Sequence, residues 1–561
     1  MPVRVSSLHS RHVVRIVHGA GVRDVLVVSE IVTEAVSRSG LEPHLSLPPA
    51  GHATGSRRLA PTVVSRRFFA VAVALALVYA VAWAAGMASF HHAPPLDSAE
   101  QLAWSYAMEG GYWKHPPLPS WIMHALVQVF GASVAVPFFA AQLSVAIALL
   151  LLWRLGCEFM SPRLSLLAAA MTALVGYYGW SADAYNHNSA LLPFQAAVTL
   201  CFYLAVRRGE WHLWVLAGLF AGLAMLVKYV ALLPLAGLLL YVLLDRDART
   251  ARTARGLAIA AAVAAAVFAP HVLWLEEHAF LPLQYARSVA VPLPSPAAWL
   301  ANAADFWLAQ FGRILPLAAV LGWMVLARRR GVVARAEAGR RGDRLFLWVV
   351  GLTPLALVVV FGLATRTEIV PRWGYNVFLL AGWLAVDALR WPERGAAKAL
   401  CVCAGMHVAL WIAATLVAPR VAEAIGWHGR STLPGQELAA AAQSTWQART
   451  DRPLRLVISD TWLGGTLVAY HGSPLAVLVD GELSRAPWVT ARDVQECGAL
   501  VVQDRSDPLP ALPGVSHWLQ AAPLHGEWIL PWARSRSRGH VPAETTIAWG
   551  VIPPQGNSCR L

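Results

Sequence analysis

The chain has 561 residues, of which 57% are hydrophobic and only 14% are charged, whereas soluble proteins are about one quarter charged. A water-soluble fold could not bury this much apolar surface, so the composition excludes an ordinary soluble enzyme. The formal net charge of +13 does not indicate nucleic-acid binding, because the arginines stand in short clusters between apolar runs, as orientation signals of membrane proteins do.

The N-terminal segment differs from the rest of the chain. Residues 1–60 contain no apolar span and no cleavable signal pattern, and residues 41–64 are rich in Gly, Pro, Ser and Arg. We expect residues 1–64 to be a disordered cytoplasmic extension or the product of a misassigned start. The remaining chain is expected to contain a transmembrane domain, residues 65–420, and an external α/β domain, residues 421–561.

Apolar residues gather in stretches of roughly 17 to 25 residues, the length that a helix needs to cross about 30 Å of hydrocarbon. Continuous runs of Leu, Val, Ala and Phe favour helices over the alternating strands of a membrane barrel. We therefore predict an all-α polytopic membrane protein with about eleven transmembrane helices, over residues 68–90, 134–153, 164–182, 190–206, 213–229, 231–245, 256–273, 314–327, 345–364, 374–389 and 398–418.

Basic residues predict the orientation of these helices. Lys and Arg gather in every second loop, and the loops between them hold few. By the positive-inside rule, we expect a cytoplasmic N-terminus and an external C-terminus. The expected location is a bacterial inner membrane. Leu118–Phe130 is apolar but short and is interrupted by His124 and Gln128. Counting it as a span would invert every later loop, so we expect an amphipathic helix at the outer surface.

Ionisable residues on the external side are few, which makes each of them a candidate for function. Asp97 and Glu100 share one face if Asp97 opens a helix. Two carboxylates in this arrangement could deprotonate an acceptor hydroxyl or hold a cation. The structural alternative is a capping box, because Asp-x-x-Glu after two prolines is also typical of a helix start.

Lys114 and His115 precede two prolines, which end any helix and hold the two basic side chains on a rigid extended turn. Such a turn suits phosphate binding, although Lys114 could instead meet lipid headgroups.

A polar run opens the fourth predicted span, with Asn186, His187, Asn188 and Ser189 in succession. Four polar residues at the start of a membrane helix are costly unless they face a wet cavity. The alternative is that Asn188 or Ser189 caps the helix.

Two further basic residues stand at the external side. Lys228 could snorkel to headgroups or turn inward to a lipid phosphate. Arg372 could clamp a phosphate with two hydrogen bonds, while the neighbouring Trp373 equally fits an interfacial anchor.

The external tail contains short strand-like runs at residues 454–460, 475–480 and 499–504, separated by helical stretches. A small α/β domain fits this pattern. Cys497 and Cys559 both lie in the tail, and the sequence leaves open whether they form a disulfide.

Taken in order over residues 68–420, these motifs resemble the polyprenyl-phosphate-sugar glycosyltransferases of the protein O-mannosyltransferase and lipid A aminoarabinose transferase (ArnT-like) superfamily, glycosyltransferase family 39. The motifs are Asp97-Ser98-Ala99-Glu100-Gln101, Gly-Tyr-Trp-Lys-His-Pro-Pro-Leu at 111–118, Tyr-Asn-His-Asn-Ser at 185–189, Leu-Val-Lys-Tyr at 226–229, Pro-His-Val-Leu-Trp-Leu-Glu-Glu-His at 270–278 and Arg-Trp at 372–373.

The resemblance implies a GT-C fold with external horizontal helices, a polyprenyl-phosphate-linked sugar donor and inversion at the sugar carbon. It makes Asp97 the expected catalytic base, with Glu100 assisting. Fixed cations would stabilise the phosphate leaving group in a low-dielectric cleft. The expected phosphate ligands are Lys114, His115, Lys228 and Arg372, and the expected substrate contacts are Tyr112, Asn186, His187 and Asn188.

Many members of this superfamily have an acidic residue immediately before the His-Pro-Pro turn, where this chain has Lys114. No metal ligand is therefore carried over to this position. No cofactor is firmly implied, and a divalent cation is possible but unsupported. The expected partners are a lipid-linked sugar, membrane lipid and an external acceptor, which could be lipid A, a polysaccharide, a protein hydroxyl or another lipid.

Two other classes of function compete with a transferase. A transporter or flippase would also bury a few polar residues, but near mid-membrane on broken helices, whereas these motifs cluster at one face. A binding or assembly protein could use the tail to capture a partner, yet eleven spans exceed what an anchor requires.

Overall fold

The computed structural model describes residues 65–290, 292–331, 339–506, 512–533, 544–556 and 558–561. The chain divides into two units after Ala60, and the description below concerns the unit Pro61–Leu561. The extension expected at residues 1–64 lies outside the described residues.

The transmembrane domain is helical, as predicted, and each predicted range contains a helix. Among the described residues, seven helices are long and apolar enough to cross a membrane: α2 (Arg66–Ala88), α5 (Ala135–Gly156), α7 (His187–Arg208), α10 (Ala251–Glu277), α12 (Pro296–Arg329), α13 (Arg341–Thr365) and the continuous helix Glu393–Ala424. The last of these comprises α15 (Glu393–Ile412), a π-helical turn at Ala413–Val417 and α16 (Ala418–Ala424).

Four other predicted spans hold shorter helices, namely α6 (Pro162–Ala173), α8 (Trp211–Val227), α9 (Leu232–Leu244) and α14 (Ala381–Leu389). The predicted ranges 164–182 and 374–389 are therefore only partly helical, since 3₁₀ turns at Gly176–Tyr178 and Pro371–Asn376 interrupt them. An apolar run shows that a segment is buried in lipid or protein, but it does not show that the segment is one continuous helix.

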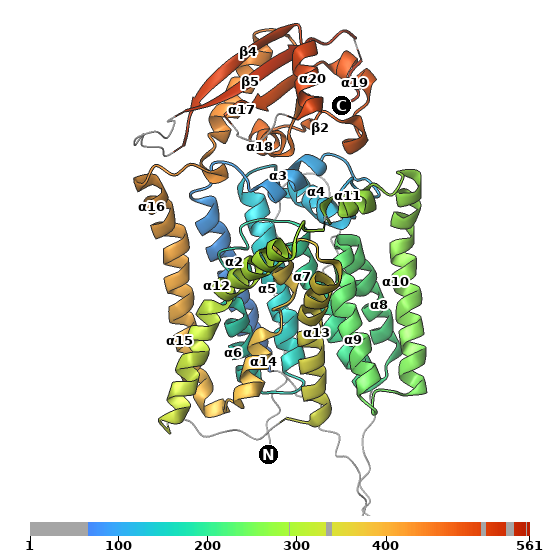
Figure 1. The fold of residues 1–561 in the computed structure, drawn as a ribbon, viewed down its shortest axis with the longest axis vertical. Coiled ribbons are helices and arrows are strands. Elements are labelled where there is room, and N and C mark those ends of the chain that lie inside the picture. Colours follow the sequence, from blue (N-terminus) through green and yellow to red (C-terminus); the bar gives the residue numbers. More distant parts are fainter. Residues whose placement is uncertain (1–64, 291, 332–338, 507–511, 534–543, 557) are drawn as a thin grey trace, which may run out of the picture. The chain divides into compact units, whose positions relative to one another are not determined.

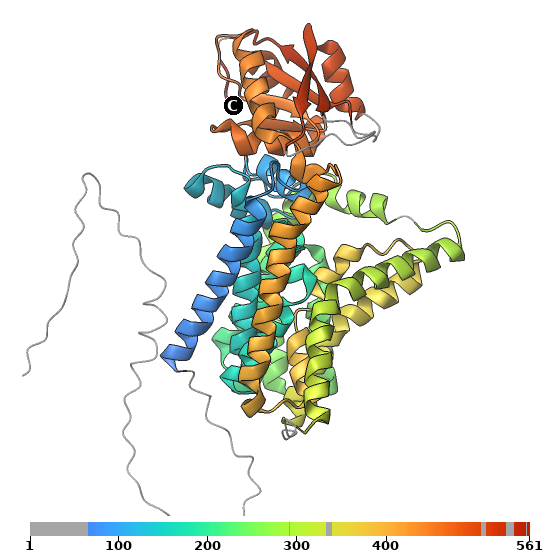
Figure 2. The ribbon, with the colours of Figure 1, turned by 90° about the vertical axis from the view of Figure 1, so that its left-hand side faces the viewer.

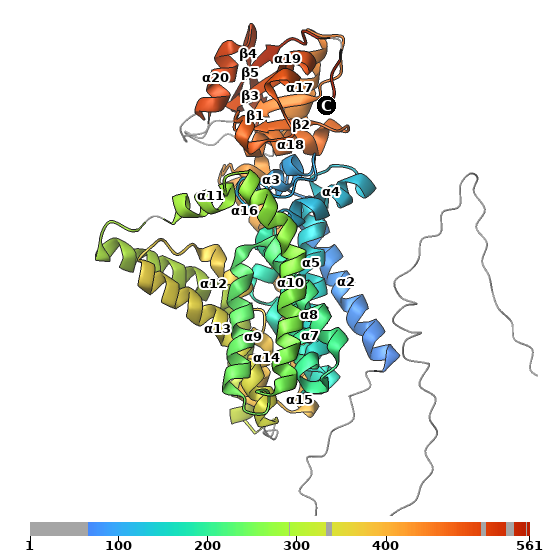
Figure 3. The same ribbon diagram turned by 90° about the vertical axis from the view of Figure 1, so that its right-hand side faces the viewer.

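The helices α5 and α7 lie at the centre of the bundle, because 67% and 83% of their most apolar windows are buried. α5 packs between α2 and α7, and α8 packs between α7 and α10. The most apolar window of α7 is 83% buried, whereas that of α2 is 22% buried. Figure 2 shows α2 beside α15, where the indole of Trp411 donates to the carbonyl of Ala82. Figure 3 shows α8, α9 and α10 together. The exposed apolar face of α2 suits lipid rather than water.

Three short helices lie near one end of this bundle: α3 (Leu96–Trp104), α4 (Leu118–Phe130) and α11 (Leu281–Val289). Figures 1 and 2 show α4 running across the direction of the long helices rather than along it. This arrangement agrees with the prediction that Leu118–Phe130 does not span the membrane.

The tail forms the predicted α/β domain. Its helices are α17 (Gly435–Gln447), α18 (Thr461–His471), α19 (Ala491–Cys497) and α20 (Pro513–Ala521). Five described strands form one sheet in the order β2-β1-β3-β5-β4, with β1 (Leu456–Ser459), β2 (Ala476–Val479), β3 (Ala499–Asp504), β4 (Leu524–Pro531) and β5 (Glu544–Ile552). β1 is parallel to β2 and β3, and β5 is antiparallel to β3 and β4. A disulfide joins Cys497 to Cys559, which confirms one of the two alternatives considered from the sequence.

The α/β domain contacts α3 directly. α18 packs on α3 so closely that a Cβ at Gly465 would lie 2.1 Å from the carbonyl oxygen of Ala99. The indole of Trp462 donates to the carbonyl of Pro94 at 3.0 Å, and the hydroxyl of Tyr470 donates to the carbonyl of His92 at 3.0 Å. The domain thus holds the helix that contains Asp97.

Candidate active site

Asp97 lies in the first turn of α3 but does not cap it. Pro95 is the N-cap residue and makes no side-chain capping bond, so the capping box considered for Asp97 and Glu100 does not form. Instead, the Asp97 carboxylate accepts a hydrogen bond from Asn186 Nδ2 at 3.0 Å and one from Arg372 Nη1 at 3.0 Å. The Asp97 side chain remains 28% exposed, which leaves it accessible to a reacting group.

Asn186 both caps α7 and positions Asp97. Its Oδ1 accepts from the backbone N–H groups of Asn188 and Ser189, at 2.8 and 3.0 Å, while the hydroxyl of Ser189 accepts from the N–H of Asn186 at 2.9 Å. This reciprocal pair is a capping box. The N-cap residue of α7 is therefore Asn186, and not Asn188 or Ser189 as the structural alternative proposed, although Ser189 completes the capping box from position N3.

Lys228 turns inward, at the point where α8 ends. Its Nζ donates to Oδ1 of Asn188 at 2.6 Å, so it does not extend towards a lipid headgroup. Asn188 and Lys228 thereby join the start of α7 to the end of α8.

The segment Tyr112–His115 is a tight turn. The backbones of Tyr112 and His115 exchange two hydrogen bonds of 3.0 and 3.2 Å, and the two prolines that follow lead into α4, as expected for a rigid turn. The ring of Tyr112 stacks on Trp104 with centroids 4.8 Å apart, and its hydroxyl donates to the carbonyl of Ala107 at 2.6 Å. Tyr112 thus supports the turn, and this hydroxyl is already engaged by the backbone rather than directed at a ligand.

The second carboxylate of α3 has a different partner from the first. Glu100 accepts a hydrogen bond from the ammonium of Lys114. Burial raises the pKa of Glu100, against the opposing effect of Lys114. Burial also disfavours the ammonium form of Lys114, but the Glu100 carboxylate outweighs it and raises the pKa of Lys114. The two therefore form a buried ion pair, separate from the pair of Asp97 and Arg372.

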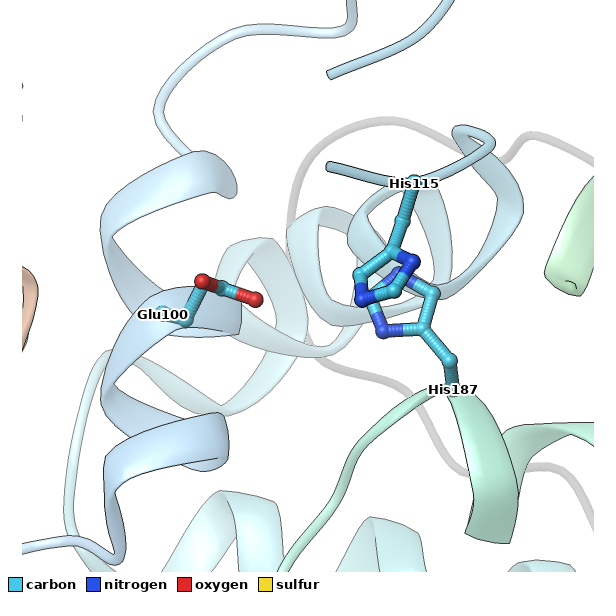
Figure 4. A group of neighbouring side chains, drawn as sticks. All are labelled: Glu100, His115 and His187. Carbon is cyan, nitrogen blue, oxygen red and sulfur yellow. The ribbon is translucent and has the colours of Figure 1, made fainter. Parts of the chain in front are cut away.

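The imidazoles of His115 and His187 lie against each other, with ring centroids 3.8 Å apart. Burial, together with the charges of Lys228 and Lys114, holds the pKa of His115 well below its usual range, so this ring is neutral near pH 7. Figure 4 shows both rings beside the carboxylate of Glu100. One ligand atom from each of the three side chains lies within 4.8 Å of the other two, a geometry from which the group could hold a metal ion.

The α/β domain adds two charged residues that sequence reasoning missed. The guanidinium of Arg485 lies 4.3 Å from the ring centre of Trp113 and donates to Asp480 at 2.6 Å. The charge of Asp480 acts on both Glu100 and Lys114. Asp480 adopts a φ of +57° at the end of β2, a conformation that is uncommon for a residue other than glycine. No local sequence signal links this position to the distant turn that it faces.

An apolar cavity of about 430 Å³ adjoins the site, between α4, α5, α7 and α8. Its lining includes Ala190 and Phe194, in the first turns of α7 after His187, and Ile122 and Leu126 of α4. An apolar chain could lie there while a polar head reaches the start of α7.

Comparisons of sequence extend this description. The sequence model of the family described as dolichyl-phosphate-mannose-protein mannosyltransferase matches residues 114–274. The lipid A galacturonosyltransferase RgtD of Rhizobium johnstonii is 26% identical over 304 residues, which cover 53% of this chain and 61% of RgtD. The match therefore spans less than two thirds of that relative's length. The lipopolysaccharide core galacturonosyltransferase RgtA of the same organism is 26% identical over 395 residues, covering 67% of this chain and 75% of RgtA.

Comparisons of structure identify solved proteins with a similar fold. The crystal structure of ArnT from Cupriavidus metallidurans bound to undecaprenyl phosphate matches with a TM-score of 0.57 and 16% identity, covering 86% of this chain and 98% of ArnT. The apo structure of the same protein matches with a TM-score of 0.56. The helical GT-C fold expected from the sequence is thus confirmed.

Proposed function

We propose that this chain transfers a sugar from a polyprenyl-phosphate donor to an external acceptor hydroxyl. The family, sequence and structure matches support this reaction, because they group the chain with the GT-C/GT39-like glycosyltransferases. The main support is the position of Asp97. It is a partly exposed carboxylate, oriented by Asn186, beside a set of fixed cations.

The proposed reaction is a single displacement. The acceptor hydroxyl oxygen attacks the anomeric carbon while the bond from that carbon to the phosphate oxygen breaks, and the phosphate leaves with the bonding electron pair. Asp97 takes the proton of the hydroxyl as a general base. Because attack occurs on the face opposite the phosphate, the configuration at the anomeric carbon inverts.

Cations stabilise the charge that grows on the leaving phosphate. Lys228 follows α8 and contacts Asn188 at the start of α7, and Lys114 lies in the 112–115 turn. The charges of both act on His115. Arg372 pairs with Asp97, and its side chain is 60% exposed, so its guanidinium has room to move to the donor phosphate. That movement would release Asp97 to accept a proton.

The donor's lipid has a suitable place beside this site. The apolar cavity next to the start of α7 would take the first prenyl units, and the phosphate would then lie near Asn188 and Lys228. A transporter would need a polar path between the helices, whereas this cavity is lined almost entirely by apolar side chains.

We also propose the topology and location of the protein. The basic loops favour a cytoplasmic N-terminus and an external α/β domain, and the bacterial source of RgtD and RgtA favours a bacterial inner membrane. The division into residues 1–64, 65–420 and 421–561 is part of this proposal. The names of RgtD and RgtA make lipid A and lipopolysaccharide core the first acceptors to test, and a uronic acid the first sugar.

The test is transfer from radiolabelled polyprenyl-phosphate sugars to lipopolysaccharide by the purified full chain. Asp97→Asn should lower the rate by roughly 10²- to 10⁴-fold, the usual contribution of a general base, while donor binding persists. Asp451→Asn is the matched control, because Asp451 is exposed between α17 and β1 and should leave the rate unchanged.

Two results would contradict the proposal. Equal transfer by the wild type and by Asp97→Asn would remove Asp97 from the mechanism. A wild-type protein that binds none of the donors but moves a lipid across vesicle membranes would identify a flippase instead.

A further inference from the structure

Three side chains from separate segments meet beside the proposed base. Glu100 belongs to α3, His115 to the Tyr112–His115 turn and His187 to the first turn of α7. Their ligand atoms all lie within 4.8 Å of one another. In Figure 4 the carboxylate of Glu100 extends towards the two imidazoles.

His187 gives a second, independent indication of a ligand. Its side chain is buried, with 4% of the residue exposed, and its Nε2 makes no hydrogen bond within the described parts of the chain. A buried polar nitrogen without a partner is unfavourable. The Nε2 of a neutral imidazole is also a common metal ligand.

We propose that Glu100, His115 and His187 bind one divalent transition-metal ion of the Zn²⁺ class. Two imidazoles and one carboxylate are a ligand set that suits Zn²⁺, and three protein ligands leave a coordination position open to water or substrate. Ligand atoms at about 2.1 Å from Zn²⁺ lie roughly 3.4 Å apart, so the three side chains close in slightly when the ion binds.

The surroundings of Glu100 fit this role. The ammonium of Lys114 contacts Oε2 of Glu100, which orients the carboxylate and leaves Oε1 for the ion. Side chains that hydrogen-bond to a metal ligand commonly orient it in this way. The charges of Lys114 and Lys228 oppose a dication, whereas those of Glu100, Asp97 and Asp480 favour it. The ion therefore enters a site of mixed charge rather than a purely basic one.

The experiment measures metal binding by the full chain, without donor or acceptor. Protein purified in detergent is stripped with a chelator, dialysed and titrated with Zn²⁺ by calorimetry, and with Co²⁺ by visible absorption. We expect one ion per chain and at least 100-fold weaker binding in His187→Gln and in Glu100→Gln. His124→Gln is the control, because His124 is half-buried in α4, where its Nδ1 contacts the carbonyl of Ser105, and it should bind the ion normally.

Size-exclusion profiles and melting curves show whether each variant is folded. If His187→Gln is not folded, His115→Gln replaces it in the metal titration. The proposal is overturned if the wild type binds no stoichiometric ion, or if folded His187→Gln and His115→Gln bind it as tightly as the wild type. Because no sugar transfer is measured, this outcome is separate from the fate of the proposed reaction.

Discussion

Gly465→Ala tests whether the α/β domain controls the position of α3. In an isolated helix, this change would stabilise the protein by about 1 kcal/mol, because alanine is the better helix former. Here the new Cβ would meet the carbonyl oxygen of Ala99 at 2.1 Å and its carbonyl carbon at 2.5 Å. Both atoms belong to the backbone and cannot rotate away, so α18 must retreat from α3 by about 1 Å, and overpacking of this kind costs about 1–3 kcal/mol.

The expected result is therefore a lower melting temperature and a fall in sugar transfer of about 10²-fold, since a displacement of about 1 Å in a catalytic group has that effect. Gly405→Ala is the control. Gly405 lies within α15, where an added Cβ meets nothing within 4 Å, so this variant should melt at the wild-type temperature or above it. Wild-type melting and transfer in Gly465→Ala would refute the reasoning that contact with α18 positions Asp97.

Three further outcomes are expected. Lys114→Met leaves the buried Glu100 without its cation, so transfer should fall at least about tenfold and unfolding should become easier by roughly 3 kcal/mol, the cost of breaking a buried ion pair. Burial raises the pKa of Asp183 from 3.8 to about 6, so the folded state holds its proton more tightly than the unfolded state, and stability should fall as pH rises from 4 to 6. The shift in pKa limits this change in the free energy of unfolding to about 3 kcal/mol, and partial exposure of Asp183 reduces it to about 1 kcal/mol. Melting temperatures of Asp183→Asn, measured across the same pH range, should not show this fall. Replacing Cys497 and Cys559 by serine opens a loop closed across 62 residues, which should destabilise the α/β domain by about 4 kcal/mol, seen as a lower melting temperature.

Each of these outcomes has its own check. Lys398→Met removes an exposed lysine from α15 and should change neither transfer nor melting. An Asp183→Asn protein whose melting depends on pH as the wild type's does would assign that dependence to another group. Reduction of the wild type should reproduce the effect of the two serine substitutions, and unchanged melting after reduction would show that the disulfide adds no stability.

Much of the site was predictable from residue type and position. Asp97, Lys228 and Asn188 stood out because ionised or polar side chains are costly beside hydrocarbon and persist there mainly for function. Their pairings were not predictable. Nothing in the spacing of Asp97 and Glu100 shows that one contacts Arg372 and the other Lys114, because those partners come from other elements of the fold.

The sequence by itself determined that the chain is a polytopic helical membrane protein with an α/β tail, because hydropathy and residue periodicity are local properties of a chain. Only the tertiary structure decided that the rings of His115 and His187 lie against each other beside Glu100, and that Asp480 and Arg485 of the tail reach the 112–115 turn. These are contacts between segments far apart along the chain. They depend on how whole helices and the sheet pack together, and no local pattern encodes that packing.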